Sequence, residues 1–567
     1  MTKKVLIIGG VATGTKAATR IKRRNPDTEV IIIEQGAIVS YGACGLPYFI
    51  SDVVHDQKEL FSTPIGIPRD ENFFKNVKRV AVFTNTRAQE IDRTNKMVKT
   101  VHIETGEKKE FFYDKLILAL GGVSVVPPLN GVNLHNIFRL RTIEDGLAIK
   151  QYLAKGKVNQ AVIVGSGLIG LEVAEALYDW GIETSVIEML GWVLPTVLDR
   201  DMGLILSRYL EEKGVHIFAS EKVVRFEGDE TGAVKRVITE KRGLAADLVL
   251  LAVGVKPNVD LAKKSGLTLG ETGALQVNEY LQTSDPDIYA GGDCVENTHR
   301  LSGKKVYVPL GSTANKHGRI IADHITGGTS SFPGVLGTAI CKVLDFNVAK
   351  TGLTEQEASA QGFEVEIVVS PGPDRPHYFP GWGNIIIKLI ADRKNGKLLG
   401  AQIMGTGDVA KRIDIVVSAL SLNALVKETA TLDLAYAPPF SSALDTIITA
   451  ANVMENKLNG MAKSLSPLKV REKLERGDNF IFLDVRSPKE YEELRIDHPK
   501  VQLIPLGKLQ EELKNLPKDK EVVTFCQISL RGYEAQRMLE AYGFTKVKFM
   551  EGGVLAWPFE RVGKIWQ

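Results

Sequence analysis

The segment GSGLIG at residues 165–170 decides the fold of the middle of this chain. It follows an apolar run at residues 160–164, which we expect to be a buried strand, and it precedes residues compatible with a helix. A second predicted strand, at residues 184–187, ends in Glu188. Strand, glycine-rich turn, helix, strand and acid follow the order of a dinucleotide-binding unit, in which the helix N-terminus holds pyrophosphate. Residues 146–275 are therefore predicted to bind a dinucleotide.

The acid at the end of the second strand predicts which nicotinamide nucleotide binds. A carboxylate there binds the free 2′-hydroxyl of NADH, whereas the 2′-phosphate of NADPH would need a basic residue, and none follows at once. A buried strand over residues 250–258 is expected to close this unit. The predicted NADH contacts are Gly165, Gly167, Leu168, Ile169, Gly170, Glu188 and Gly254.

A weaker version of the same pattern opens the chain. An apolar strand at residues 4–8 precedes GGVATG at residues 9–14, and a helix over residues 15–24 and a strand over residues 29–33 lead to Glu34. Val11 replaces the middle glycine of the motif, so an ordinary tight turn is the alternative. Two such units imply two nucleotides, one that carries hydride and one that is a tightly held flavin.

Composition limits the remaining possibilities. A chain of 567 residues is expected to form about three or four domains. Its net charge of +3 favours neither nucleic acid nor a membrane surface as partner, and no apolar run is long enough to span a membrane. The four cysteines match neither a disulfide framework nor a zinc pattern, so we expect a reducing, cytoplasmic location and no metal.

Two cysteines stand in contexts that suggest chemistry. Cys44 lies in SYGACGLPY at residues 40–48 with no second cysteine nearby, so any sulfur partner must come from elsewhere. Its place at a predicted helix start favours the thiolate. Cys526 follows a predicted strand at residues 521–525 and precedes a predicted helix at 533–542, an arrangement in which backbone N–H groups and the helix dipole lower a thiol pKa. Arg531 adds a cation to that loop.

The two glycine-rich units and the segment IYAGGD at residues 288–293 resemble the flavin-dependent pyridine-nucleotide disulfide oxidoreductases over residues 1–455. The resemblance implies FAD, with Asp293 on its ribityl chain; Cys294 beside it is expected to be a buried apolar filler. The FAD contacts so implied are Gly9, Gly10, Val11, Ala12, Gly14, Glu34, Ala119, Gly121 and Asp293.

Within that family the lone cysteine separates the branches. Members with a CxxxxC pair keep their disulfide internal, and this chain has no such pair. NADH peroxidases and oxidases cycle one cysteine through sulfenic acid, but they typically carry a histidine in the first glycine loop, which is absent here. SYGACGLPY is similar to the stretch that coenzyme A disulfide reductases pair with coenzyme A, although Ala43 replaces a common asparagine.

That branch implies a coenzyme A site on the basic helix. Its charge pattern alone is typical of a solvated helix face, but the resemblance makes its arginines candidates for the phosphates of coenzyme A. The implied contacts are Arg20, Arg23, Ser40 and Lys78.

Residues 331–458 resemble the family's dimerisation domain, which implies a homodimer. The segment LAYAPPFSS at residues 434–442 is similar to one that reaches the partner's active site, which makes Tyr436 a candidate proton or hydrogen-bond donor. Tyr378 is a second candidate. The alternative for both is an ordinary core or interface aromatic residue.

The C-terminal region resembles a rhodanese domain, whose cysteine carries sulfane sulfur as a persulfide. The similarity rests on DVR at residues 484–486, CQISLRG at 526–532 and GGVLAW at 552–557. The loop from Cys526 to Arg531 is short, which suits sulfur rather than phosphate, and Gln527 replaces an arginine found in some members.

The whole layout is similar to coenzyme A disulfide reductase–rhodanese fusions, which include NADH-dependent persulfide reductases. The predicted fold class is α/β, with two Rossmann-like domains, an α+β dimerisation domain and an α/β rhodanese domain. The predicted boundaries are 1–145 with 276–330 for FAD, 146–275 for NADH, 331–458 for dimerisation, 459–466 for a linker and 467–567 for the rhodanese domain.

The predicted activity is NADH-driven reduction of coenzyme A persulfide, polysulfide or coenzyme A disulfide at Cys44, with Cys526 handling sulfane sulfur and hydrosulfide as a product. The alternatives are an NADH oxidase or peroxidase, and a carrier that delivers persulfide sulfur to a partner protein.

Overall fold

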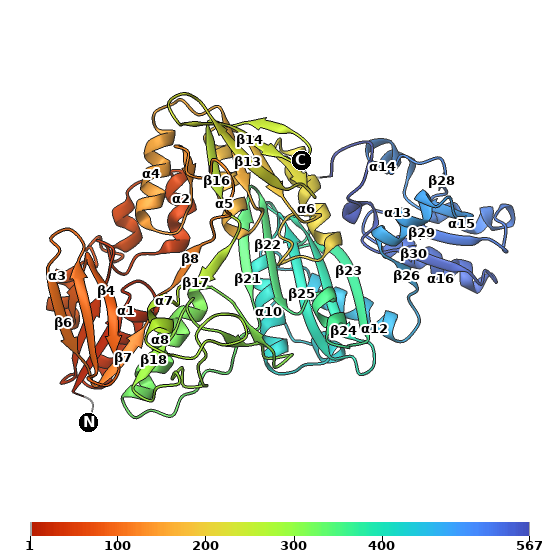
Figure 1. Cartoon of the computed structure of the whole chain (residues 1–567). Helices are drawn as coiled ribbons and strands as arrows, with labels where there is room; N and C mark the ends of the chain where they lie inside the picture. The colour runs from red at the N-terminus through yellow and green to blue at the C-terminus, as the bar shows by residue number, and fades with distance from the viewer. Residues whose placement is uncertain (1–2, 566–567) are drawn as a thin grey trace. The chain divides into compact units, whose positions relative to one another are not determined.

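A computed structural model describes residues 3–565 of the chain (Figure 1). The chain divides into two compact units, one of Met1–Ile187 with Glu221–Val335 and the other of Glu188–Ser220 with Leu336–Gln567. In the part of the chain that the structure describes, no helix has both the length and the apolar character needed to cross a membrane.

The first unit opens with a parallel sheet in the order β18-β7-β1-β2-β3. Strands β1 and β2 have the predicted bounds, and their side chains are almost wholly buried because both faces of the sheet are covered. The bounds are β1 (Lys4–Ile8), β2 (Glu29–Ile33), β3 (Ala81–Phe83), β7 (Lys115–Leu118) and β18 (Ile288–Ala290).

Two helices lie side by side against this sheet, α1 (Thr13–Arg24) and α8 (Gly311–Ile325). A Cβ on Gly318 would lie 2.5 Å from the carbonyl oxygen of Thr13, so a glycine is needed where the helices meet. Helix α1 begins at Thr13 rather than at the predicted residue 15, because the last turn of the glycine loop is already helical.

The first unit contains a second parallel sheet with the order β11-β10-β16-β9. Its strands are β9 (Ile137–Phe138), β10 (Gln160–Val164), β11 (Glu183–Glu188) and β16 (Leu248–Leu251), and α5 (Leu168–Asp179) follows β10. The strand predicted over residues 250–258 is interrupted, since Gly254, with φ of +111°, turns the chain into β17 (Val255–Pro257). Strand β17 pairs antiparallel with β8 (Gly122–Ser124).

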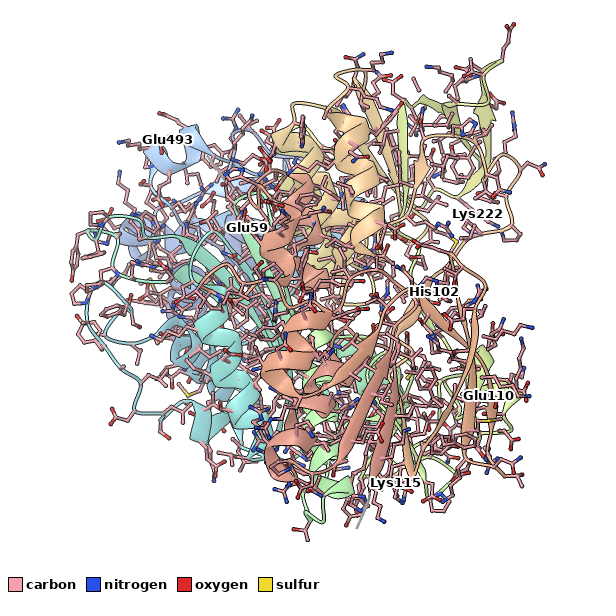
Figure 2. All side chains as sticks on the ribbon, turned by 90° about the vertical axis from the view of Figure 1, so that its left-hand side faces the viewer. Glu59, His102, Glu110, Lys115, Lys222 and Glu493 are labelled. Carbon is pink, nitrogen blue, oxygen red and sulfur yellow. The ribbon has the colours of Figure 1, made fainter. Side chains whose placement is uncertain are left out.

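Two small antiparallel sheets in the first unit were not predicted. One contains β4 (Thr86–Asp92), β5 (Met97–His102) and β6 (Lys108–Phe112), and Figure 2 labels His102 and Glu110 on it. The other contains β13 (Val223–Gly228), β14 (Val234–Thr239) and β15 (Gly243–Ala245).

The second unit is built on an antiparallel sheet in the order β21-β22-β25-β24-β23. Strand-like patterns at residues 384–389 and 398–404 and a helical pattern at residues 410–420 correspond to β24, β25 and α10, each with slightly longer bounds. The elements are β21 (Ala339–Val343), β22 (Phe346–Gly352), β23 (Val365–Pro373), β24 (Asn384–Asp392), β25 (Leu398–Gly405), α10 (Val409–Ser421) and α12 (Thr446–Leu458).

A buried ion cluster fastens α6 (Arg200–Glu212) to this sheet. The ammonium of Lys388 is fully buried and lies 2.8 Å from Asp201, 2.8 Å from Glu355 and 3.2 Å from Asp199. Burial alone would lower the pKa of Lys388, but the three carboxylates outweigh burial and raise it. Lys388 therefore stays charged and compensates carboxylates that are themselves mostly removed from water.

We expect Lys388→Met to destabilise the second unit by about 3–5 kcal/mol, because it leaves buried carboxylates without their cation. The measurement is the calorimetric unfolding midpoint, compared with that of Lys394→Met. Lys394 is the matched control because its side chain is 74% exposed, where an ion pair contributes little. Equal midpoints for the two variants would show that the cluster contributes nothing to stability.

The C-terminal residues of the second unit form a parallel sheet in the order β26-β30-β29-β27-β28. Strand β29 has its predicted bounds, but the helix predicted from residue 533 begins at Leu530, directly after the cysteine loop. The strands are β26 (Ser464–Leu465), β27 (Phe480–Asp484), β28 (Val501–Leu503), β29 (Glu521–Phe525) and β30 (Val547–Met550). The helices are α13 (Pro467–Glu475), α14 (Pro488–Glu493), α15 (Leu506–Glu512) and α16 (Leu530–Ala541).

Candidate active site

The first glycine loop is a backbone cradle with no room for side chains. Gly9 has φ of +105°, and a Cβ on it would lie 2.1 Å from the carbonyl oxygen of Ala119. A Cβ on Gly14 would lie 1.9 Å from the carbonyl oxygen of Gly9. The end of β1, the start of α1 and the end of β7 therefore meet at this loop, as a dinucleotide site requires. Val11 and Ala12 complete the loop, and Val11 O accepts a hydrogen bond from the Thr15 hydroxyl at 2.5 Å.

The acid predicted to bind ribose lies against this cradle. Glu34 Oε2 accepts from the Gly10 N–H at 2.6 Å, and its Oε1 accepts from the Gly36 N–H at 2.8 Å. Burial raises the pKa of Glu34 although backbone hydrogen bonds oppose that shift. A ribose hydroxyl that donates to this carboxylate would favour its charged form.

Asp293 also lies beside this cradle. Its carboxylate pairs with Arg141 at 2.5 Å, and Arg141 lies 3.5 Å from the position of a Cβ on Gly121. Gly292, the neighbour of Asp293, approaches the Thr13 side chain so closely that a Cβ on it would lie 2.7 Å from the Thr13 hydroxyl. The structure therefore brings the predicted FAD residues together, and it adds Arg141, which the sequence analysis missed.

A buried polar atom near the crevice also fits a bound group. The Tyr307 hydroxyl lies 3.2 Å from the position of a Cβ on Gly122 and has no hydrogen-bond partner among the described residues. Buried hydroxyls are usually paired, so an added ligand or water would satisfy it. Together, the glycine cradle, the two carboxylates and this hydroxyl fit a flavin dinucleotide.

The second glycine loop has the same tight geometry with one open side. A Cβ on Gly165 would lie 2.5 Å from Ala252 O, and a Cβ on Gly170 would lie 2.2 Å from Gly165 O. Gly167 faces open space, with nothing within 4 Å of its Cβ position, and Gly254 is open in the same way. An open backbone face at the start of α5, beside Leu168 and Ile169, is what a pyrophosphate needs. Glu188 ends β11, and its Oε1 accepts from the Leu190 N–H at 2.8 Å.

Cys44 lies in the same unit as both loops, within a single turn (Ala43–Gly45) ahead of α2 (Leu46–Ile50). It is exposed, and all four cysteines of the chain are free thiols. Its Sγ lies 3.7 Å from the position of a Cβ on Gly311, the first residue of α8. Ser40 is close to Cys44 in the sequence. It also lies beside the first glycine loop, because its N–H donates to Gly10 O at 2.8 Å.

The Cys44 thiol has a raised pKa, which is the opposite of the shift expected from a helix start. Although the residue is exposed, the protein packed around it removes the sulfur partly from water and raises the pKa, and the carboxylates of Glu172 and Asp293 raise it further. Helix α2 has only five residues, so its dipole is too small to offset these effects. A cation or a bound electrophile is needed before the thiolate dominates at neutral pH.

Glu172 is a second functional candidate that the sequence analysis missed. It lies on α5, two residues after the last glycine of GSGLIG, and burial raises the pKa of its carboxyl to about 7. A carboxyl that titrates near neutral pH within electrostatic range of a cysteine is typical of a catalytic site. The sequence did contain a signal for Glu172: it is an acidic residue near the start of a helix whose neighbouring residues are apolar.

We expect Glu172→Gln to shift alkylation of Cys44 by iodoacetamide to lower pH, since it removes a negative charge that raises the pKa of the thiol. Below about pH 7 the carboxyl is mostly protonated, so the parent and variant should react alike; above it the variant should react faster. Rate against pH is the measurement, with exposed Glu183→Gln as control. If parent and Glu172→Gln showed the same dependence of alkylation rate on pH, the proposed coupling between Glu172 and Cys44 would be contradicted.

The predicted coenzyme A residues lie on or near α1. Arg20 Nε donates to Asp323 at 2.7 Å, which raises the pKa of Arg20, and Arg23 Nε donates to Thr19 O at 3.2 Å. The Lys78 ammonium lies 5.1 Å above the ring of Phe73. Arg20 is thus partly neutralised by Asp323.

Tyr378 and Tyr436 are surface residues of the second unit. Their exposed fractions are 67% and 52%, so neither is a core aromatic residue of its own chain. Phe440, in the same segment as Tyr436, is 66% exposed. Large exposed aromatic side chains of this kind are typical of an interface.

Cys526 lies at the end of β29 and is fully buried beneath its loop. Ser529 has φ of +99°, a strained value for a residue with a side chain, and its hydroxyl accepts from the Gly552 N–H at 2.7 Å. Cys526 O accepts from the Val554 N–H at 2.9 Å. The loop is therefore held in shape by the turn at residues 552–554.

Arg531, the cation predicted for this loop, is paired with a carboxylate. It makes a two-point pair with Glu490 of α14, at 2.9 Å and 2.5 Å. Its pKa is raised mainly by Glu490, and Cys526 contributes too. Glu490 was also missed by the sequence analysis.

No group of three or more His, Cys, Asp or Glu side chains among residues 3–565 is arranged to hold a metal ion.

Comparison with known proteins identifies the parts of the chain. Sequence models of three families match it: "Pyridine nucleotide-disulphide oxidoreductase" at residues 3–318, the dimerisation domain of the same family at 338–448, and "Rhodanese-like domain" at 466–559. These matches confirm the predicted fold class and the predicted order of a nucleotide-binding region, a dimerisation domain and a rhodanese domain.

Three similar proteins agree with this. An NAD(P)H coenzyme A polysulfide/persulfide reductase of Pyrococcus horikoshii is 38% identical over 80% of this chain and 99% of its own length. The structure of an NAD-dependent persulfide reductase from A. fulgidus is 43% identical, with a TM-score of 0.93, over 98% of this chain and 100% of that one. The structure of reduced Bacillus anthracis CoADR-RHD is 33% identical, with a TM-score of 0.91, over 98% of each chain.

The chain therefore belongs to the pyridine nucleotide-disulphide oxidoreductase family, and it carries a rhodanese-like domain after the family's dimerisation domain.

Proposed function

We propose that this protein uses NADH to reduce coenzyme A persulfide, polysulfide or coenzyme A disulfide through Cys44, and that Cys526 handles sulfane sulfur. The observation that carries the proposal is an exposed, free Cys44 near two dinucleotide cradles, on a chain with a second cysteine at the base of a rhodanese loop. Relatives named as coenzyme A persulfide reductases support the same substrate class.

The family's cofactors are FAD and a nicotinamide dinucleotide. We propose that FAD is held by the first glycine loop, Glu34, the glycine and alanine that follow β7, and Asp293, and that NADH is held by the second loop and Glu188. When bound, the flavin supplies a two-electron carrier between the nicotinamide and sulfur. We propose that the chain itself supplies a backbone cradle for the flavin and a thiol, Cys44, close to that cradle.

The sulfur step at Cys44 is a thiol–disulfide exchange. The Cys44 thiolate attacks the carrier sulfur of CoA–S–SH, so that a Cys44–S–S–CoA bond forms, the S–SH bond breaks and HS⁻ leaves. Two electrons and one proton then restore the Cys44 thiolate and release CoA–SH. With coenzyme A disulfide, the same attack releases one CoA–SH in place of hydrosulfide.

The coenzyme A nucleotide is proposed to bind through Arg20, Arg23, Ser40 and Lys78, since its phosphates suit guanidinium and ammonium groups. We further propose a homodimer in which Tyr378 and Tyr436 reach the partner's site, because both are exposed. The domain boundaries predicted above remain our proposal. So does a cytoplasmic location, which free thiols favour.

The test is anaerobic NADH oxidation with coenzyme A persulfide, polysulfide and coenzyme A disulfide, set beside oxidation by oxygen alone. We expect turnover with the sulfur substrates and little with oxygen. Turnover with oxygen alone that survives Cys44→Ser would contradict the proposal.

The role of Cys526 is tested with Cys526→Ser. We expect this variant to lose polysulfide turnover by at least about tenfold while it keeps coenzyme A disulfide turnover, because only polysulfide requires sulfur transfer from the rhodanese loop. Unchanged polysulfide turnover would show that sulfur relay is not required.

A further inference from the structure

The rhodanese loop presents no unpaired cation from the two arginines that reach it. Arg486 is fully buried and pairs with Asp484 at 2.7 Å. Its Nη1 donates to Gln527 Oε1 at 3.1 Å and to Glu490 O at 3.3 Å. The side chain of Gln527, the first residue after Cys526, is therefore engaged with a buried guanidinium whose charge is already compensated.

The second arginine is compensated as well. Arg531 makes two hydrogen bonds to Glu490, whose own pKa is lowered to about 2 mainly by Arg531. Glu490 is in turn fixed by the Ser487 N–H at 3.0 Å and the Ser487 hydroxyl at 2.8 Å. The carboxylate thus stays ionised and in place over the range in which the protein would work.

The outer edge of the loop, called the rim below, is formed by the apolar residues Ile528 and Leu530 rather than by a cation. Leu530, the first residue of α16, is 59% exposed, and Ile528 is half-buried. A large exposed aliphatic side chain beside a nucleophile disfavours a strongly hydrated ion. The backbone N–H groups at the start of α16 remain to hold a single negative charge on sulfur.

We propose that Cys526 accepts sulfur from thiol persulfides, R–S–SH, and discriminates against thiosulfate, with Gln527 and Leu530 as specificity-determining residues. Thiosulfate is a dianion whose sulfonate would need unpaired donors or cations at the rim. A persulfide has no sulfonate and carries at most one charge on its outer sulfur. This inference rests on the proposed role of Cys526 as a sulfur acceptor.

The transfer balances without any added oxidant or reductant. The Cys526 thiolate attacks the outer sulfur of R–S–SH, so that Cys526–S–SH forms, the R–S bond to that sulfur breaks, and R–S⁻ leaves. The reaction with thiosulfate would form the same protein persulfide and release sulfite.

The experiment loads the full-length holoenzyme with glutathione persulfide or with thiosulfate, without NADH, and locates the added sulfur by peptide mass spectrometry. In the parent we expect the Cys526 peptide to gain sulfur from glutathione persulfide at least about tenfold faster than from thiosulfate, the effect of one missing charge-assisted contact. Gln527→Arg and Leu530→Lys, which add a cation at the rim, should narrow that ratio by about tenfold.

A matched control is Glu493→Gln. Glu493 projects from the end of the same helix as Glu490, and its side chain is 65% exposed (Figure 2). Removing its charge should leave the ratio unchanged, because it does not pair with Arg531. If Glu493→Gln narrowed the ratio of loading rates as much as the added cations do, net charge rather than the rim would set the preference for the sulfur donor.

Two results would overturn the inference: equal or faster loading by thiosulfate in the parent, or a ratio that neither added cation alters. NADH oxidation with coenzyme A disulfide, measured on the same samples, separates this failure from failure of the proposed function. If that activity is present while thiosulfate loads Cys526 as well as glutathione persulfide does, the inference about the sulfur donor is wrong and the proposed function stands.

Discussion

Replacement of Cys44 by serine is expected to abolish NADH-driven reduction of coenzyme A disulfide and coenzyme A persulfide, by at least about 10³-fold, while the flavin stays reducible by NADH. The reason is that Cys44 is an exposed free thiol, whereas the other three cysteines of the chain are buried, so we expect the mixed disulfide to depend on Cys44. A serine hydroxyl keeps the size of the side chain but cannot form a disulfide.

Two anaerobic measurements separate these steps. Stopped-flow absorbance follows reduction of the flavin by NADH, and a thiol assay follows release of coenzyme A from its disulfide. The matched control is Cys341→Ala, which removes a buried cysteine of β21 in the other unit and should retain both steps. If Cys44→Ser keeps more than a small fraction of the disulfide turnover, Cys44 is not the acceptor.

Gly14→Ala is expected to give protein without bound flavin and hence without activity. The new Cβ would lie 1.9 Å from the carbonyl oxygen of Gly9, and backbone cannot move aside as a flexible side chain would. The turn must open, which displaces the start of α1 from the pyrophosphate position. Such overpacking costs about 1–3 kcal/mol, which we expect to appear as a loss of flavin affinity.

The measurement is the flavin absorbance of the purified protein per polypeptide, before and after addition of excess FAD. Gly507→Ala is the matched control, because nothing lies within 4 Å of its Cβ position and its φ is not positive. Yellow Gly14→Ala protein with normal flavin content would show that this loop does not hold the cofactor.

Much of the fold was predictable because local patterns determine it. Strands such as β1 and β10 are short apolar runs that end in glycines, so both their type and their bounds follow from the sequence. The small antiparallel sheets, such as β4-β5-β6, were missed because their exposed strands contain many charged residues and alternate poorly.

Individual site residues were predictable where a motif contains them, and pairing partners were not. Cys44, Cys526 and Asp293 lie in recognisable segments. Glu172 and Glu490 act through space: their importance depends on burial and on a guanidinium or thiol that the fold brings near them. For the same reason, the protonation of Cys44 was predicted in the wrong direction, since burial, and after it carboxylates distant in sequence, raise its pKa.

The most direct test of the account is the stoichiometry of one anaerobic reaction, in which NADH and coenzyme A persulfide are mixed with the holoenzyme and NADH, hydrosulfide and coenzyme A are all quantified. We expect each NADH consumed to yield one hydrosulfide and one coenzyme A thiol, and we expect Cys44→Ser to yield neither. Consumption of NADH without hydrosulfide, or only when oxygen is admitted, would contradict it.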